Sequence, residues 1–429
     1  MVQKSTPYAL FLFLADIVFL SLALWITLLV RYLAIPDFSL YLSHWYPFAY
    51  IFAIWIIVYF IYDLYRIHIS FFQKKLLVTL FNVHIINSVI AVIFFYLIPY
   101  FGITPKTNMF IFLFVSFLFM AIWRIYLAPI VFKNRSESVV FACQGKEVDQ
   151  LSDHFKNNTR QQITVCEPLA NHDIETIRER FPEASLVAIN TYGQQTDILS
   201  GLYQLIFSGL RFISVESIYE DLFGRIPLTL ISERWFLQHV STHPKPLYDF
   251  LKRLIDLIVA MVSGIISLIF YPMVFILIKI EDGGPMFFKQ ERVGRKGKVF
   301  VVYKFRSMAN GQVTKVGRFL RVLRIDELPQ LWSVISGDLS LVGPRPERPD
   351  YVEKYRHDIP YYDIRHLITP GLSGWAQLYH DNHPHFDLEV EATREKLSYD
   401  LYYIKNRSLI LDLIIIIKTV RVLLSRSGR

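Results

Sequence analysis

The stretch YALFLFLADIVFLSLALWITLLVRYL, residues 8–33, decides the fold class. It is longer than the about 20 mostly apolar residues that an α-helix needs to cross about 30 Å of hydrocarbon. Three similar stretches follow, at Trp45–Leu64, Leu76–Pro99 and Met109–Phe132. We therefore predict a bundle of four transmembrane helices over residues 1–135. The first stretch is too long for a cleavable signal peptide, and it lacks a small-residue cleavage site.

Positive charge is distributed unevenly between the loops of these stretches. Near the membrane, the loops on one side carry only Arg31 and Lys106. The other side carries Lys4, Arg66, Lys74, Lys75, Arg124, Lys133 and Arg135. Because lysine and arginine accumulate in cytoplasmic loops, the amino terminus and everything after residue 132 should be cytoplasmic. Asp16 and Asp63 lie in or near the spans, where we favour contacts between helices or a position at the membrane interface over a proton pathway.

The composition narrows the class of partner. Hydrophobic residues make up 53% of the 429-residue chain, and the formal net charge is +8. A basic balance fits phospholipid headgroups, polyprenyl phosphates or nucleotides, without choosing between them. Cys143 and Cys166 are the only cysteines in the sequence, so we expect no disulfide framework.

Residues 136–245 have the composition of a water-soluble α/β domain. Helical patterns at Ile174–Arg180 and Thr196–Ser208 alternate with short runs rich in β-branched residues. The predicted strands are Ser138–Ala142, Ile163–Cys166, Leu186–Ile189 and Phe212–Val215. This alternation indicates a small parallel sheet of the Rossmann-like type. A dinucleotide site needs a glycine-rich turn after the first strand. Only Gly145 stands there, which favours a structural or regulatory role over cofactor binding.

A fifth apolar run, Leu257–Ile278, is long enough to span but has basic residues at both ends. Lysines and arginines precede and follow it, so both ends are expected in the cytoplasm. Pro272 lies past its middle, and a proline kinks or breaks a helix. We predict a re-entrant hairpin over about 253–280 with its hinge at Pro272; an ordinary fifth span remains the alternative.

The segment 283–377 is dense in residue types that carry chemistry. Within it, DELPQLWSVISG (326–337) predicts one short helix with Asp326 as the N-cap, Pro329 in the first turn and Gly337 at the end. Adjacent side chains on a helix point about 100° apart. One of the two acids can therefore face a phosphorus atom while the other, Glu327, binds Mg²⁺, which prefers oxygen ligands.

Basic residues around the acidic pair are candidate phosphate ligands. Arg318, Arg321 and Arg324 recur every third residue, which makes one cationic stripe on a helix. Arg345 stands between two prolines, and a guanidinium held in this way suits a phosphate. A turn-rich loop ends in Gln377. The predicted phosphate-binding set comprises Arg292, Lys304, Arg306, Arg318, Arg321, Arg345 and Gln377.

Seven motifs, in order, resemble the bacterial sugar transferase family, the monotopic phosphoglycosyl transferases that begin exopolysaccharide, O-antigen and capsule assembly. They are KRLID (252–256), GP (284–285), QERVG (290–294), KFRSM (304–308), DELPQ (326–330), VGPRPE (342–347) and PGLSG (370–374). The later YDLYYI (399–404) and Asp412 also resemble the family. The amino-terminal half resembles the large subgroup, in which four spans and a degenerate nucleotide-fold domain precede the catalytic domain, here 246–429.

The resemblance implies a two-step transfer at the inner (cytoplasmic) membrane of a bacterium, with the catalytic domain on the cytoplasmic face. Asp326 would attack the sugar-bearing phosphorus of a UDP-sugar and expel UMP. Undecaprenyl phosphate would then take the sugar 1-phosphate from Asp326. Glu327 would bind Mg²⁺, and Arg345 would belong to the phosphate site. The implied partners are the two substrates and membrane phospholipid, without nucleic acid; a homo-oligomer is compatible with the sequence.

Three positions depart from the family's usual pattern, and the acidic pair is not among them. They are Tyr271-Pro272 where Ser-Pro is common, Asn310-Gly311-Gln312 where an Asp and an Arg are usual, and Arg324 where a Ser is common. The second hypothesis is a catalytically inactive membrane scaffold or regulator of polysaccharide assembly. It predicts the loss of Asp326, Glu327 or Arg345, and all three are present. Galactose, glucose and N-acetylated sugars are all compatible with these motifs.

Overall fold

The computed structural model describes residues 6–62, 64–65, 73–97, 106–131, 137–157, 163–166, 186–192, 210–240, 245–379 and 390–424. The chain divides into two compact units, Met1–Phe223 and Gly224–Arg429. Asp63 and the predicted helices Ile174–Arg180 and Thr196–Ser208 lie outside the described residues.

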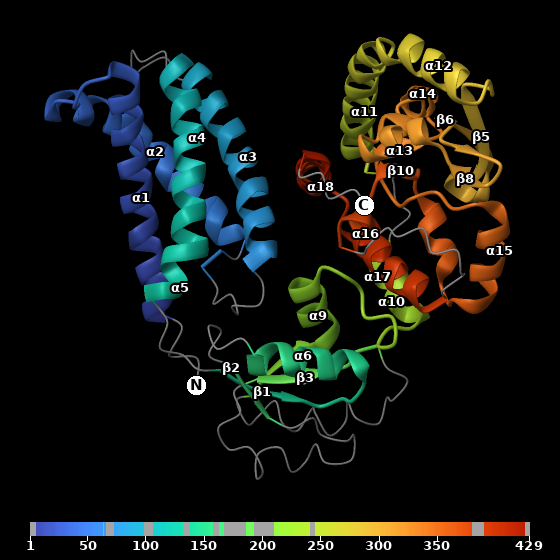
Figure 1. Cartoon of the computed structure of the whole chain (residues 1–429). Coiled ribbons are helices and arrows are strands. Elements are labelled where there is room, and N and C mark those ends of the chain that lie inside the picture. The colour runs from blue at the N-terminus through green and yellow to red at the C-terminus, as the bar shows by residue number, and fades with distance from the viewer. Residues whose placement is uncertain are drawn as a thin grey trace. The chain divides into compact units, whose positions relative to one another are not determined.

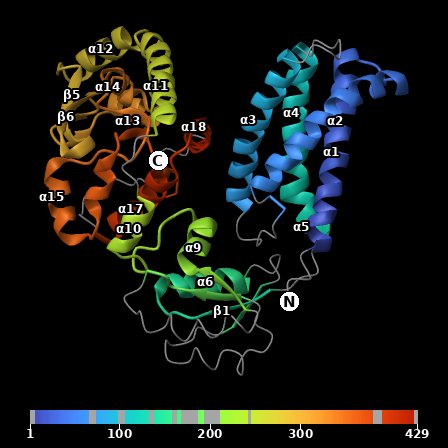
Figure 2. The same ribbon diagram turned by 180° about the vertical axis from the view of Figure 1, so that it is seen from behind.

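Four long helices begin the first unit: α1 (Thr6–Tyr32), α2 (Phe38–Ile61), α3 (Gln73–Leu97) and α4 (Lys106–Ile122). They run side by side in both views of Figures 1 and 2. Each contributes to a segment long and apolar enough to cross a membrane, as predicted. α2 begins earlier than the predicted Trp45, because the Asp37 carboxylate accepts a hydrogen bond from the Phe38 amide and caps the helix.

A buried ion pair links two of these helical segments. Asp16 on α1 and Arg124 in the π-turn η3 (Trp123–Leu127), which continues α4, are both almost fully buried. Arg124 Nε donates to Asp16 Oδ1 at 3.1 Å, Nη2 pairs with Oδ2, and Nη1 donates to the Leu64 carbonyl at 2.5 Å. The prediction that Asp16 makes a contact between helices is confirmed.

A four-stranded parallel sheet follows in the same unit, and its strands agree with the prediction. The strands are β1 (Glu137–Phe141), β2 (Ile163–Cys166), β3 (Leu186–Ile189) and β4 (Arg211–Ser214), in the order β2-β1-β3-β4. α6 (Lys146–Asn157) follows β1, and α9 (Val215–Phe223) follows β4. Val139, Val140 and Phe141 of β1 are fully buried. Apolar residues along a central parallel strand pack on both faces, which explains the short continuous β-branched runs in the sequence.

The second unit begins earlier than the predicted catalytic domain. Residues just after Phe223 bond to its carboxyl-terminal half: Ile226 N donates to Ser398 O at 3.0 Å, and Trp375 Nε1 donates to Gly224 O at 2.7 Å. Short helix α10 (Glu233–His239) follows these contacts. Its Trp235 is buried and lies beneath the Lys405 ammonium, 5.0 Å from the ring centroid.

The apolar run of this unit forms two helices, α11 (Pro246–Ser267) and α12 (Phe270–Glu281), which bend by 51° at the break between them. Pro272 lies in the first turn of α12, after the break, rather than at the bend itself. A proline cannot donate to the carbonyl four residues earlier. That carbonyl belongs to Leu268, which instead accepts from Tyr271 N at 3.2 Å. The bend therefore falls one turn before the proline.

The Tyr271 side chain links this bend by a hydrogen bond to Trp332, which lies on the helix Gln330–Ser336. Its hydroxyl accepts a hydrogen bond from Trp332 Nε1 at 2.9 Å. Its ring packs edge-on against Phe305, with the centroids 4.9 Å apart, and against Phe287 at 5.9 Å. Through these contacts the tyrosine of the Tyr271-Pro272 pair holds the bend against Trp332, Phe287 and Phe305.

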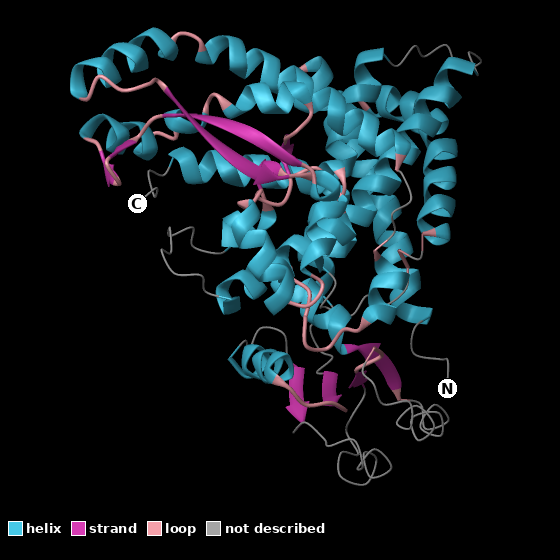
Figure 3. Ribbon diagram, turned by 90° about the vertical axis from the view of Figure 1, so that its right-hand side faces the viewer, coloured by secondary structure: helices cyan, strands magenta, loops and turns pink. Residues whose placement is uncertain are grey.

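A long twisted antiparallel ribbon, β5 (Phe287–Val293) with β6 (Val299–Phe305), packs beneath the bent pair (Figure 3). The remaining elements are η7 (Arg295–Gly297), β7 (Met308–Ala309), β8 (Gln312–Val313), α13 (Lys315–Val322), η8 (Ile325–Glu327), α14 (Gln330–Ser336), β9 (Ser340–Val342), α15 (Pro349–Asp358), η9 (Tyr362–Leu367), β10 (Gly371–Ser373), α16 (Trp375–Tyr379), α17 (Val390–Asn406) and α18 (Leu409–Leu424). β9 and β10 pair in parallel.

Two apolar clusters hold the acidic turn η8 in place. Ile325 is buried in a cluster with side chains of α12, α13 and β6, namely Val274, Ile278, Leu320 and Phe305. α14 packs through Leu331 and Val334 in the second cluster, against Ala260 of α11 and the inner face of the ribbon. The segments before and after η8 are therefore both packed into apolar clusters, which fixes the backbone that carries Asp326 and Glu327.

Candidate active site

Asp326 and Glu327 lie on a turn of 3₁₀ helix rather than at the start of an α-helix. The residue before the turn, Arg324, has left-handed backbone angles (φ 55°), which reverse the chain between α13 and η8. The predicted N-cap role of Asp326 is therefore wrong. α14 starts after Pro329 and has no side-chain cap, although its carboxyl-terminal cap is Gly337, as predicted. The intervening turn arises because Ile325 must reach the apolar cluster below it.

Glu327 is held among three cations. Its Oε1 lies 3.0 Å from Lys304 Nζ and 3.3 Å from Arg345 Nη2, and its Oε2 lies 3.6 Å from Arg324 Nη1. Burial alone would raise the pKa of Glu327, but Arg345, Lys304 and Arg324 outweigh burial and hold this pKa well below its usual range. Burial in turn lowers the pKa of Lys304, and Glu327 offsets only part of that change. Glu327 therefore remains ionised across the physiological range.

Asp326 has the opposite environment. Its side chain is buried, and Oδ1 has no hydrogen-bond partner among the described residues. Burial, and then repulsion from Glu327, raise the pKa of Asp326, while Lys304, Arg321 and Arg324 oppose the rise. A poorly solvated carboxylate with one unsatisfied oxygen, surrounded by cations, is suited to attack an electrophile such as phosphorus. The two neighbouring acids thus have different chemical roles available to them.

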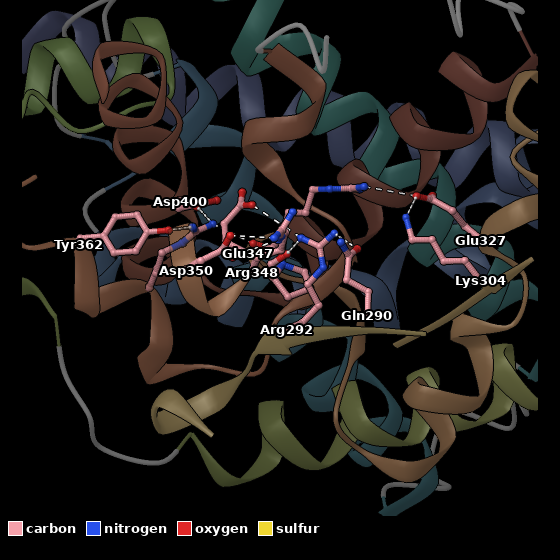
Figure 4. A network of polar contacts seen from close by, with 12 residues as sticks. Gln290, Arg292, Lys304, Glu327, Glu347, Arg348, Asp350, Tyr362 and Asp400 are labelled. Carbon is pink, nitrogen blue, oxygen red and sulfur yellow. Dashed lines mark hydrogen bonds and ion pairs between the residues drawn. The ribbon is translucent and has the colours of Figure 1, made fainter. Parts of the chain in front are cut away.

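The loop that carries Arg345 is fixed from two sides (Figure 4). Arg292 donates to Pro346 O at 3.0 Å and to Gln290 Oε1 at 2.5 Å. On the other side, Arg365 donates to Arg345 O at 2.9 Å.

Arg365 is itself fixed by buried polar partners. It donates to Asp400 Oδ2 at 2.8 Å and to the Tyr362 hydroxyl at 2.6 Å. These bonds hold the backbone at Arg345 in place, so its guanidinium reaches Glu327 from a preorganised loop.

Close backbone approach also shapes this loop. A Cβ atom on Gly371 would lie 2.1 Å from Gly343 N, and a Cβ on Gly343 would lie 2.6 Å from Thr369 O. The VGPRPE and PGLSG motifs therefore meet, backbone against backbone, and glycine is required at both positions.

The predicted phosphate ligands divide into three groups by where they lie relative to Asp326 and Glu327. Lys304 and Arg345 contact Glu327 directly, and the positive charge of Arg321 acts on Asp326. Arg292 supports the Arg345 loop. The others are further out: Arg306 pairs with Asp282 at 2.9 Å, Arg318 is exposed on α13, and Gln377 lines a cavity of about 30 Å³ together with Arg345.

Two contributors were missed as site residues. Arg324 was noted as part of the cationic stripe and as a departure from the family pattern, but it was left out of the predicted phosphate-binding set. Asp400 stands within the YDLYYI motif, but the sequence does not show that it forms a buried ion pair, 2.8 Å long, with Arg365, which lies 35 residues earlier in the chain. Only the fold reveals that this pair supports the Arg345 loop.

The parallel sheet of the first unit carries a buried acid at the carboxyl-terminal edge of its strands, next to the edge where a dinucleotide fold binds phosphate. Glu216, buried at the start of α9, accepts from Thr191 N at 3.1 Å and from Thr191 Oγ1 at 3.3 Å, and pairs with Ser214 Oγ. Its carboxylate thus occupies donors that follow the carboxyl ends of β3 and β4. Together with the lone Gly145, this arrangement disfavours phosphate binding at that edge.

The family model described as bacterial sugar transferase matches residues 247–426. The chain is 38% identical over 190 residues to the uncharacterized sugar transferase EpsL of Bacillus subtilis (strain 168), covering 42% of this chain and 89% of that protein. The chain belongs to the bacterial sugar transferase family.

Two relatives have more specific names. An Aeromonas hydrophila protein named UDP-N-acetylgalactosamine-undecaprenyl-phosphate N-acetylgalactosaminephosphotransferase is 40% identical over 231 residues, which cover 50% of this chain and 52% of that protein. A Xanthomonas campestris pv. campestris protein named UDP-glucose:undecaprenyl-phosphate glucose-1-phosphate transferase is 30% identical over 303 residues, covering 66% of this chain and 56% of the relative. The chain thus spans about half the length of these two relatives.

Proposed function

We propose that the protein transfers a sugar 1-phosphate from a UDP-sugar to undecaprenyl phosphate and releases UMP. The observation that carries this proposal is the pair Asp326 and Glu327, in which Glu327 lies among three cations and Asp326 keeps a buried oxygen that has no hydrogen-bond partner among the described residues. The names of the Aeromonas and Xanthomonas relatives support the donor and acceptor classes. Such a transfer is the first membrane step of exopolysaccharide, O-antigen or capsule synthesis.

The chemistry proceeds in two displacements at phosphorus. Asp326 Oδ1 forms a bond to the sugar-bearing phosphorus, the bond from that phosphorus to the bridging oxygen breaks, and UMP leaves with the electron pair. The phosphate oxygen of the acceptor lipid then attacks the same phosphorus, and Asp326 leaves as the free carboxylate. Lys304, Arg321 and Arg345 neutralise the charge that spreads over the transferred phosphoryl group.

Mg²⁺ is consistent with the donor set of this site. Two adjacent carboxylates and the oxygens of a diphosphate provide the hard ligands that Mg²⁺ prefers. No third Asp, Glu, His or Cys joins the pair among the residues that the structure describes. Glu327, with Asp326 beside it, would hold the cation, which would neutralise charge on the diphosphate. Lys304 and Arg345 already contact Glu327 Oε1, so these cations would share the carboxylate with the metal.

The membrane placement is part of the proposal. We assign residues 1–135 to a multi-pass bundle in the bacterial inner membrane, 136–245 to a cytoplasmic Rossmann-like domain that lacks a cofactor fingerprint, and 246–429 to a catalytic domain on the cytoplasmic face. The 51° bend between α11 and α12 supports a re-entrant hairpin over about 253–280. Phospholipid surrounds this hairpin, and the oligomeric state is left open.

Labelling from either side of the membrane tests the hairpin. Leu247→Cys and Lys289→Cys flank the bent pair at exposed positions and can be placed separately in a Cys143→Ala/Cys166→Ala chain. Both should react with a membrane-impermeant maleimide only from the cytoplasmic side. Labelling of the two sites from opposite sides would establish a fifth span instead.

Release of UMP from a panel of UDP-sugars, with Mg²⁺ and undecaprenyl phosphate, tests the reaction. The wild type should release UMP with one donor, and Asp326→Asn should lose at least about a thousandfold in rate. Undiminished release by the variant would remove Asp326 as the nucleophile. If the folded wild type released UMP from no donor, the alternative of an inactive scaffold for polysaccharide assembly would be favoured.

A further inference from the structure

A second cavity in the catalytic unit shares no residue with the Asp326 site. Its volume is about 610 Å³, within the range of small-molecule sites. It lies between the first turns of α11, the turn η7 at the tip of the β5–β6 ribbon, and the corner between α17 and α18. Lys304 lies near the other end of that ribbon. Strands of seven residues place the two ends about 20 Å apart.

Positive charge dominates the cavity wall. The charged lining residues are Lys252, Arg253, Arg295, Lys296, Arg407, Asp249 and Asp256, so five cations face two acids. Asp412, which pairs with Lys252 at 3.1 Å from outside the lining, brings the acids to three and leaves a surplus of two cations. Leu339, Val342, Ile368 and Ile404 supply an apolar floor.

The cations of the cavity differ in how many hydrogen bonds and ion pairs they form with the rest of the protein. Arg253 is used structurally, because it donates to the carbonyls of Val334 and Ile335 at 2.7 and 2.9 Å. In contrast, Arg295 and Lys296 are exposed and form no ion pair within the described part of the chain. Arg407 Nε is buried and has no hydrogen-bond partner among the described residues, and its Nη1 lies 3.9 Å from Asp249. An unsatisfied guanidinium nitrogen in a cavity with surplus positive charge calls for an anionic ligand.

The position of the cavity indicates the source of that anion. α11 begins at Pro246, and its first two turns carry the polar lining residues Asp249, Lys252 and Arg253. The same helix also exposes apolar side chains, from Leu247 and Phe250 in its first turns to Ile258 and Val262 further along. If α11 enters the bilayer as proposed above, the cavity lies at the depth of the lipid headgroups, where basic side chains attract anionic lipids.

We propose that this cavity is a phosphate-binding site, distinct from the catalytic centre, that takes the headgroup phosphate of an acidic phospholipid. Arg407 and the η7 pair Arg295 and Lys296 contact the phosphate, and the apolar floor contacts the glycerol and the upper acyl chains. A lipid held here anchors the tip of the ribbon and the start of α11 at the membrane surface. The position of the cavity at the depth of the lipid headgroups rests on the proposed function. The binding of a phosphate by the cavity's basic residues does not depend on it.

The test uses the full chain in nanodiscs, without donor sugar. Phosphatidylglycerol is titrated into a phosphatidylcholine background, and bound lipid is counted by native mass spectrometry. Arg295→Gln/Lys296→Gln should weaken binding by roughly tenfold or more, since each basic residue near a membrane surface adds about 1 kcal/mol of attraction to anionic lipid. The matched control, Lys298→Gln/Lys354→Gln, removes two exposed charges of the same unit that do not line the cavity.

A second arm distinguishes the source of the phosphate. Inorganic phosphate and glycerol 3-phosphate are titrated against the protein in phosphatidylcholine alone, followed by calorimetry. Binding confined to this arm, and lost in Arg295→Gln/Lys296→Gln, would assign the cavity to a soluble phosphate. If both double variants bound both kinds of ligand like the wild type, the phosphate site would be refuted. Because no step measures UMP release, this result is independent of whether the transferase proposal holds.

Discussion

The two units each contain a buried carboxylate beside arginine, but they use the charges differently. In the helical bundle, Asp16 and Arg124 satisfy each other one to one, and both side chains are at most 3% exposed. In the second unit, Glu327 has three cationic neighbours, and one oxygen of Asp326 beside it has no hydrogen-bond partner in the part of the chain that the structure describes. The first arrangement is complete without a ligand. The second has surplus positive charge and an acid whose oxygen lacks a partner among the described residues. This imbalance distinguishes a site for an anionic substrate from a structural ion pair.

The largest effect on stability is expected from breaking the balanced pair. Asp16→Asn leaves Arg124 charged, buried and unpaired, which should destabilise the bundle by about 3–5 kcal/mol. Thermal unfolding in detergent measures this loss. The rate of UMP release per folded molecule should not change, because Asp16 belongs to the unit that does not contain Asp326.

A double variant sharpens this prediction. Asp16→Asn/Arg124→Gln removes both charges and should recover much of the lost stability, since two neutral amides leave no uncompensated charge. If the double variant were as unstable as the sum of the two single variants, the ion pair would not be the source of the effect.

At the Asp326–Glu327 site, where cations outnumber acids, removal of one cation should lower the rate of UMP release rather than the stability of the fold. Arg345→Gln takes away one of the two cations on Glu327 Oε1 and, in the proposed reaction, a donor to the transferred phosphoryl group, so UMP release should fall by about a hundredfold. Arg348→Gln is the matched control, because Arg348 is exposed and, among the described residues, its side chain pairs with Asp350 and lies over the Tyr351 ring, away from Glu327. The control should stay within about twofold of the wild type. Equal losses in both variants would contradict a specific role for Arg345.

The raised pKa of Asp326 predicts a pH dependence of the first displacement. Attack requires the ionised carboxylate, so the rate should fall as pH drops through the pKa of Asp326. Burial and Glu327 raise that pKa, and the acid limb should therefore lie above about pH 4, the ordinary range for aspartate. UMP release without acceptor lipid isolates this step from ionisation of the lipid phosphate. A rate that stays constant down to pH 4 would contradict the raised pKa.

The sequence predicted the features that follow from local patterns. The four spans follow from apolar length, and the strands of the parallel sheet follow from runs of β-branched residues. The acidic pair and Arg345 were identified because they stand within continuous motifs. In the structure, Lys304 and Arg345 do meet at Glu327.

The features that the sequence missed depend on tertiary packing. Asp326 reads as a helix cap by its residue type and by the helix-like pattern after it. In the structure Ile325 is buried, Asp326 lies on a 3₁₀ turn, and the helix starts only at Gln330. Asp400 supports Arg345 only through Arg365, a contact between distant segments. Pro272 marked the bend to within one turn, but the partner of Tyr271 could not be read from the sequence.

The smallest expected effect concerns that last contact. Tyr271→Phe removes the acceptor for Trp332 Nε1 but keeps the ring on Phe305, so it should lower the unfolding free energy of the catalytic unit by about 1 kcal/mol. Tyr303→Phe is the control, because that hydroxyl forms no hydrogen bond among the described residues. Urea unfolding in detergent measures both variants.

Tyr271→Ser restores the Ser-Pro break that is common in the family and gives a more severe comparison. It loses the ring contacts with Phe287 and Phe305 as well as the hydrogen bond. It should therefore destabilise the unit more than Tyr271→Phe does, by about 2 kcal/mol, which is less than for a fully buried ring because Tyr271 is only partly buried. If the serine variant were as stable as the wild type, the bend would be fixed by the proline and the backbone alone. The aromatic side chain would then be incidental to the hairpin.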